Sequence, residues 1–111
     1  MSLHARITLP CDFYCLHTRP AMWIDFHLRG IDASLRFIQG DASVEIRPEV
    51  AVVDIMQAAT ELQLDAGTTF EIVCEGMQAR ETLDALRTAF TTNYFEGSDF
   101  VEVLEEEDKD D

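Results

Sequence analysis

The stretch CLHTRPA, residues 15–21, lies between an extended segment and a helical one. Before it, LHARITL (3–9) alternates apolar and polar residues, which is typical of a half-buried strand, and Pro10 ends that strand. Residues 10–16 are expected to form a loop. His17 therefore falls just before a helix, where an imidazole could cap the helix, bind a metal, act as a general base or accept a group covalently.

The first helix is expected over residues 18–29, because Pro20 suits a first turn and Gly30 suits the position after the last one. Three residues at helical spacing form its inward stripe: Ala21, Ile24 and Leu28. Three more apolar residues widen this stripe beyond what one core face needs: Met22, Trp23 and Phe26.

The rest of the chain continues to alternate between strand and helix patterns. Strands are predicted over 32–38, 42–46 and 68–74, and helices over 54–64 and 78–91. The third helix has four apolar residues on one face: Ala79, Leu83, Leu86 and Phe90. The order β-α-β-β-α-β-α predicts an α+β fold in which the helices cover one face of an antiparallel sheet.

Length and charge restrict the possible functions. A chain of 111 residues with 47% apolar content fits one domain with a modest core. The net charge is −14, and nine acidic residues and one lysine lie from Glu96 onward, so nucleic-acid binding is not expected. The domain is predicted over 1–91. An acidic extension is predicted over 92–111, with 92–104 as an extra strand or a docked arm and EEEDKDD as a disordered tail.

Neither a membrane span nor a metal site is expected. No apolar run is long enough to cross a membrane, and the amino end lacks the apolar region of a secretory signal, which together predict a cytoplasmic protein with reduced thiols. Cys11, Cys15 and Cys74 have no second Cys/His pair to complete a zinc site. His4 and His27 have no ligand neighbours at suitable spacing, and no cofactor is expected.

The residues around His17 suit phosphoryl transfer. The first backbone N–H groups of a helix have no internal partners and, with the helix dipole, favour an anion. A phosphoryl group on His17 would lie among the amides of Thr18 and Arg19, and the Arg19 guanidinium is a planar fork that matches phosphate oxygens. Pro20 stiffens this turn without removing a needed donor. The alternative is that His17 is merely a tolerated cap beside an arginine.

LHTRPA (16–21), placed between the first strand and the first helix, resembles the active-site segment of the histidine-containing phosphocarrier proteins (HPr) of the sugar phosphotransferase system. DIMQAATELQLDAGTTFEIVCEG (54–76) is similar to the second helix, glycine turn and last strand of that family. The likeness covers residues 3–91. It implies an open-faced β-sandwich of four antiparallel strands with three helices on one side.

The resemblance also implies a function. His17 would accept a phosphoryl group on its pros ring nitrogen from Enzyme I charged by phosphoenolpyruvate, and would pass it to a histidine of an Enzyme IIA-type domain. Arg19 and the backbone amide of Thr18 would steady the group in transit, since such transfers depend mostly on positioning and charge neutralisation. The protein would be a monomeric relay in sugar transport or regulation, and not an enzyme with its own small-molecule substrate.

Three positions depart from the family pattern. Cys15 stands where glycine is usual and Tyr14 where asparagine is common, so the loop is expected to be reshaped, and Cys15 suggests a redox-control hypothesis. Asp54 occupies the place of a regulatory serine. It is either a built-in mimic of the phosphorylated state that tunes partner choice or an ordinary N-cap, preceded by an irregular stretch over 47–53.

In the family, the first two helices form a docking face with an apolar centre ringed by cations. Here that apolar centre would comprise five residues: Thr18, Met22, Phe26, Ile55 and Met56. Arg19 and Arg29 are the cations that the sequence places on this face, so steering toward acidic partners is expected to be weak.

Two other functions fit the sequence. One is a regulatory or adaptor protein on the same fold that acts by binding, with little phosphoryl flux, and whose acidic tail could shield the docking face. The other is an unrelated ferredoxin-like α+β binding module in which LHTRPA is coincidental. The adaptor hypothesis predicts slow or absent labelling of His17.

Overall fold

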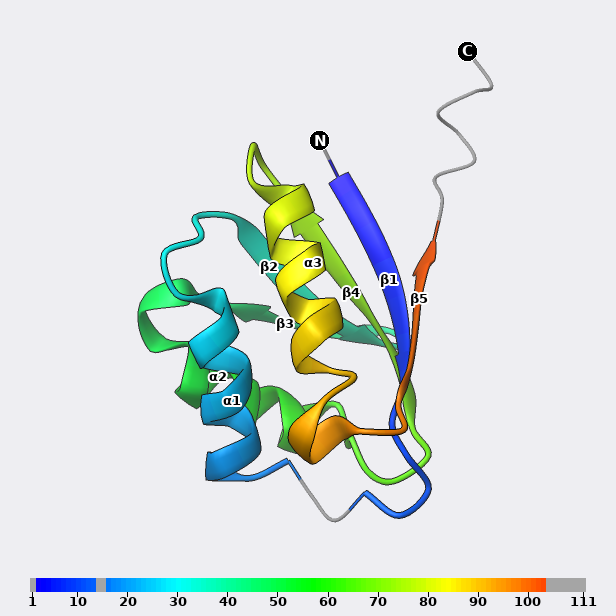
Figure 1. Cartoon of the computed structure of the whole chain (residues 1–111). Helices are drawn as coiled ribbons and strands as arrows, with labels where there is room; N and C mark the ends of the chain where they lie inside the picture. Colours follow the sequence, from blue (N-terminus) through cyan, green and yellow to red (C-terminus); the bar gives the residue numbers. More distant parts are fainter. Residues whose placement is uncertain (1, 14–15, 104–111) are drawn as a thin grey trace, which may run out of the picture.

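Three α-helices lie against one face of an antiparallel sheet in the computed structural model, which describes residues 2–13 and 16–103 (Figure 1). The strands are β1 (Ser2–Thr8), β2 (Ser34–Gln39), β3 (Ala42–Ile46), β4 (Thr69–Glu75) and β5 (Asp99–Val103). The helices are α1 (Thr18–Leu28), α2 (Ala51–Glu61) and α3 (Ala79–Ala89). Two short 3-10 turns are η1 (Pro48–Val50), before α2, and η2 (Asn93–Phe95), before β5.

The sheet has the strand order β3-β2-β4-β1-β5, and every neighbouring pair is antiparallel. The predicted α+β class, with the helices on one face, is confirmed (Figure 1). The predicted count of four strands is wrong, because β5 pairs along the outer edge of β1, with Ile7 opposite Phe100. Of the two alternatives for residues 92–104, the extra strand is the correct one.

The core fills the space between the sheet and the helices. The predicted inward stripes of the first and third helices are buried: Ala21, Ile24, Leu28, Ala79, Leu83, Leu86 and Phe90. The ring centroid of Phe90, which directly follows α3, lies 5.8 Å from that of Phe70 on β4 and 4.8 Å from that of Phe95 on η2. Aromatic contacts therefore join segments that lie far apart in the sequence.

The segment from 92 to 103 is part of this core. Phe95 is fully buried, and its ring stacks on Phe13 with the centroids 5.3 Å apart. This contact connects η2 to the loop after β1. The chain up to residue 103 thus packs against the part of the fold that precedes residue 91. The predicted EEEDKDD tail lies outside the described residues.

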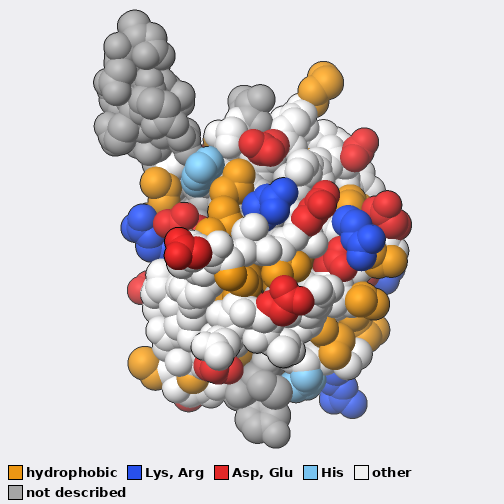
Figure 2. All heavy atoms as spheres, turned by 180° about the vertical axis from the view of Figure 1, so that it is seen from behind, with side chains coloured by type: hydrophobic (Ala, Val, Ile, Leu, Met, Phe, Trp, Pro, Cys, Tyr) orange, Lys and Arg blue, Asp and Glu red, His pale blue; other side chains and the backbone are white. Residues whose placement is uncertain are grey.

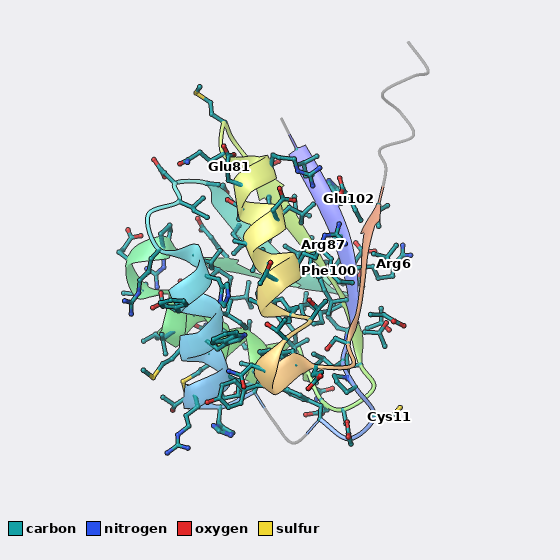
Figure 3. All side chains as sticks on the ribbon, in the orientation of Figure 1. Arg6, Cys11, Glu81, Arg87, Phe100 and Glu102 are labelled. Atoms are coloured by element: carbon teal, nitrogen blue, oxygen red, sulfur yellow. The ribbon has the colours of Figure 1, made fainter. Side chains whose placement is uncertain are left out.

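Side-chain contacts also attach β5 to α3 (Figure 3). The Glu102 carboxylate accepts a hydrogen bond from Arg80 at 3.0 Å and lies 3.5 Å from the Arg87 guanidinium. Arg87 in turn lies over the Phe100 ring, 5.0 Å from its centroid. The edge strand is thus held both by its ladder with β1 and by ion pairs from the helix layer.

The second helix begins earlier than the sequence predicts, at Ala51. Pro48 opens a 3-10 turn that leads directly into α2, so most of the stretch predicted to be irregular is helical. The N-cap residue is Val50, and the prediction that Asp54 caps this helix is wrong. Asp54 instead lies in the first turn, where its carboxylate bonds to Arg47.

The opposite face of the sheet has no helical cover among the described residues. Figure 2 shows charged side chains of both signs on this face, interspersed with single apolar ones. Arg6 on β1 and Glu71 on β4 pair there at 3.8 Å, each about half exposed. No helix in the described part of the chain combines the length and the apolar character needed to cross a bilayer.

Candidate functional site

His17 occupies the N-cap position of α1, with an extended backbone and an exposed side chain. Its carbonyl accepts the first intrahelical hydrogen bond, from the Ala21 N–H at 3.0 Å. The amides of Thr18 and Arg19 therefore precede the first intrahelical donor, and Pro20 has no N–H to offer. An anion next to His17 would meet two backbone donors and the positive end of the α1 dipole.

Arg19 adds a charged side chain beside this helix start. Its guanidinium is exposed, and no carboxylate of the described residues lies within ion-pair distance of it, unlike the five arginines that are paired. Thr18 uses its hydroxyl differently, because Oγ1 donates a hydrogen bond to the Met56 sulfur of α2 at 3.8 Å. The first turn of α1 is thus tied to α2, while Arg19 remains available to an anion.

The surface near His17 is more apolar than a typical helix surface. Met22 and Phe26 are 52% and 59% exposed, and Met56 is half-buried. Ile55 is fully buried in the core, so its predicted place on an exposed docking face is wrong. Val53 on α2 is 62% exposed, and the sequence does not predict this position because the VAVV stretch gives no signal of a helix start.

The second predicted cation on this face, Arg29, is already engaged. Its guanidinium lies 3.6 Å from the Asp25 carboxylate and 5.9 Å from the Phe26 ring centroid. Of the two, Arg19 is therefore the cation whose charge no neighbouring carboxylate among the described residues offsets.

Asp54 is a buried structural residue in this fold. Its carboxylate accepts hydrogen bonds from the Arg47 backbone N–H at 2.8 Å and from the Arg47 guanidinium at 2.9 Å, and its side chain is 3% exposed. The hydrogen bond from Arg47 holds the pKa of Asp54 below its ordinary value, and Asp54 raises the pKa of Arg47. A carboxylate that is covered and neutralised in this way cannot present its charge to a docked partner, which removes the physical basis for the phosphoserine-mimic hypothesis.

The thiols and histidines of the described residues form no metal centre. No group of three or more His, Cys, Asp or Glu side chains in the described ranges could hold an ion. Cys74 is buried, which raises the pKa of its thiol to about 12 and makes it unreactive, whereas Cys11 lies exposed in the loop after β1. The hypotheses about Tyr14 and Cys15 fall outside the described residues.

A groove lies between α1 and η2. It has a volume of about 320 Å³ and six lining residues: Arg19, Met22, Trp23, Phe26, Asn93 and Tyr94. The sequence predicts the apolar excess of α1 but not the second wall, because the placement of η2 depends on the burial of Phe95. We refer to it below as the α1/η2 groove.

Comparison of the chain with models of known protein families and with curated proteins gives no match.

Proposed function

We propose that the protein is a cytoplasmic phosphocarrier that is phosphorylated on His17. The observation that carries the proposal is the exposed imidazole at the N-cap of α1, next to two backbone donors and the Arg19 guanidinium. Neutral imidazole is a good nucleophile near pH 7, and the site offers positive charge where the transferred group would sit.

In the proposed step, the pros nitrogen of His17 attacks the phosphorus of a phosphohistidine on the donor protein, Enzyme I. The new N–P bond forms as the donor's N–P bond breaks, and the donor imidazole leaves. The same exchange in the other direction passes the group to a histidine of an Enzyme IIA-type partner. Because the bonds broken and formed are alike, catalysis reduces to positioning and charge neutralisation, which Thr18 and Arg19 would supply.

An adaptor that binds partners with little phosphoryl flux is the second candidate. It is favoured by the exposed apolar side chains of α1 and α2 and by the engagement of Arg29 with Asp25, which leaves few cations to steer an acidic phosphoryl donor. Both functions use the same surface, so only a measurement of phosphoryl transfer separates them.

The deciding experiment is intact-mass analysis after incubation with phosphoenolpyruvate and Enzyme I. We expect one acid-labile phosphoryl group on the wild-type chain and none on His17→Ala. His4→Ala is the matched control, because it removes a histidine from β1 and should keep the label. Arg19→Ala should slow labelling about tenfold or more, since it removes the guanidinium expected to neutralise the transferred group.

Absence of label on a folded wild-type sample, tested with several Enzyme I proteins, would favour the adaptor. Label that persists in His17→Ala would place the acceptor elsewhere in the chain.

A further inference from the structure

The α1/η2 groove has the geometry of a protein-docking site. Its α1 wall is a stripe of four residues at i, i+3, i+4 and i+7, from Arg19 to Phe26, and η2 forms the facing wall. Met22 is 52% exposed, Phe26 59% and Tyr94 43%. Contiguous exposed apolar side chains of this size mark interaction surfaces, and Met, Tyr, Trp and Arg are enriched in such surfaces.

The groove walls are fixed before any ligand arrives. The Trp23 indole N–H donates a hydrogen bond to the Ala89 carbonyl at 3.1 Å, and its ring packs edge-on against His27 with centroids 4.4 Å apart. Tyr94 lies in η2, and the last residue of that turn, Phe95, is fully buried in the core. A groove that is already ordered loses little conformational entropy when it binds a ligand.

The charge distribution indicates which ligand the groove fits. Arg19 is the one charged residue of its lining, and no described carboxylate offsets it. A carboxylate on the ligand would pair with this guanidinium while an apolar side chain fills the groove. A second copy of the chain, nucleic acid and anionic lipid are disfavoured, because each carries many negative charges and a protein of net charge −14 repels them, whereas a single carboxylate can be neutralised by Arg19.

We propose that the α1/η2 groove binds an exposed segment of a partner protein that presents an aromatic or aliphatic side chain directly beside a carboxylate. Asn93 offers its side-chain amide to the backbone of that segment. The groove shares Arg19, Met22 and Phe26 with the predicted docking face and adds the η2 wall to it, and its existence does not depend on phosphorylation of His17.

The test uses the full chain and short peptides as probes. The chain has a single tryptophan, so the Trp23 indole N–H gives one assignable signal in a proton–nitrogen correlation spectrum, from a side chain that lines the groove. Acetyl-Gly-Phe-Glu-Gly-amide should shift this signal in a saturable way. The Gln version should bind about fivefold more weakly and the version with Ser in place of Phe should cause no saturable shift.

Two variants locate the binding. Tyr94→Ala should weaken binding of the Glu peptide about tenfold, because it removes the η2 wall. Val53→Ala, which removes an exposed apolar side chain on α2 outside the groove, should bind as the wild type does. The variants' own spectra check that both are folded.

Three results would overturn the proposal. One is an indole signal that no peptide moves, and another is equal affinity for the Glu and Gln peptides. The third is an indole shift that follows the concentration of the protein alone, which would make a second copy of the chain the occupant.

Discussion

The Asp54–Arg47 pair joins two elements through one side chain. Asp54 belongs to the first turn of α2, and Arg47 directly follows β3, so the bidentate contact with the guanidinium and the bond from the backbone N–H fix the path of the chain between them. Because Arg47 is 57% exposed, solvent screens part of its charge. The hydrogen bonds to the buried carboxylate therefore contribute more to stability than the attraction between the two charges does.

We predict that Asp54→Asn lowers the free energy of unfolding at pH 7 by about 1.5–3 kcal/mol, the range for a hydrogen bond to a charged group. Since the pKa of Asp54 is lower in the folded chain, its contribution is complete above the unfolded pKa of about 3.9 and is lost as the pH falls through the folded pKa. In urea unfolding across this pH range, the difference in the free energy of unfolding between the wild type and the variant should become smaller as the pH falls.

Asp84→Asn is the matched control, because Asp84 pairs with Arg80 at 3.5 Å but is 63% exposed. Asp84→Asn should change the free energy of unfolding by no more than about 0.5 kcal/mol. Equal stability of Asp54→Asn and the wild type at pH 7 would show that the buried pair contributes nothing.

Gln63 has a backbone conformation that suits glycine. Its φ is 54°, and it follows the C-cap of α2, where the Leu64 N–H bonds back to the Ala59 carbonyl at 3.0 Å. We predict that Gln63→Gly raises the free energy of unfolding by about 0.5–1 kcal/mol, because relief of left-handed strain exceeds the added entropy of glycine in the unfolded chain. Thermal unfolding measures the change.

Asn93 provides the comparison, since its φ of 55° is almost the same but asparagine tolerates this region better. Asn93→Gly should therefore raise the free energy of unfolding by less than Gln63→Gly does. A loss of stability in Gln63→Gly would mean that its side chain contributes more than the strain costs.

At the scale of elements, the η2–β5 segment is a structural part of the fold. Phe95 is the residue on which this role depends, because it lies between Phe13 and Phe90 and is fully buried. We predict that Phe95→Ala lowers the free energy of unfolding by about 3–5 kcal/mol, as expected for an aromatic side chain removed from a core. Urea unfolding would measure this loss.

Tyr94 precedes Phe95 and lies on the surface. Tyr94→Ala should therefore lower the free energy of unfolding by less than about 1 kcal/mol. A small loss in Phe95→Ala would show that η2 and β5 are only loosely attached.

Most elements of the fold could be predicted from local patterns. The β1 alternation, the α1 stripe and the α3 stripe each carry a periodicity that the structure confirms. The start of α2 was missed because VAVV has strong β propensity, and the contact between Asp54 and Arg47 overrides it. DFVEV is short and acidic, so its strand depends on a free β1 edge that no local pattern reveals.

At the scale of the whole molecule, some features of the candidate site could also be predicted from local sequence patterns and others could not. The position of His17 at a helix start and the exposure of Met22 and Phe26 could be read from α1 alone. The burial of Ile55 and the facing wall of the α1/η2 groove could not, because both depend on which segments meet across the layers. The sequence therefore predicts the position of the proposed acceptor, His17, but not the full surface of the groove.

The position of β1 between β4 and β5 also has a consequence for synthesis on the ribosome. β1 is synthesised before both of its partners: Thr8 meets Thr69, 61 positions downstream, and β5 follows later still. Pairing at such separations is slow, and an open strand edge can join another chain. Until β4 and β5 have been synthesised, both edges of β1 in the nascent chain lack their partners and are open to pairing with another chain.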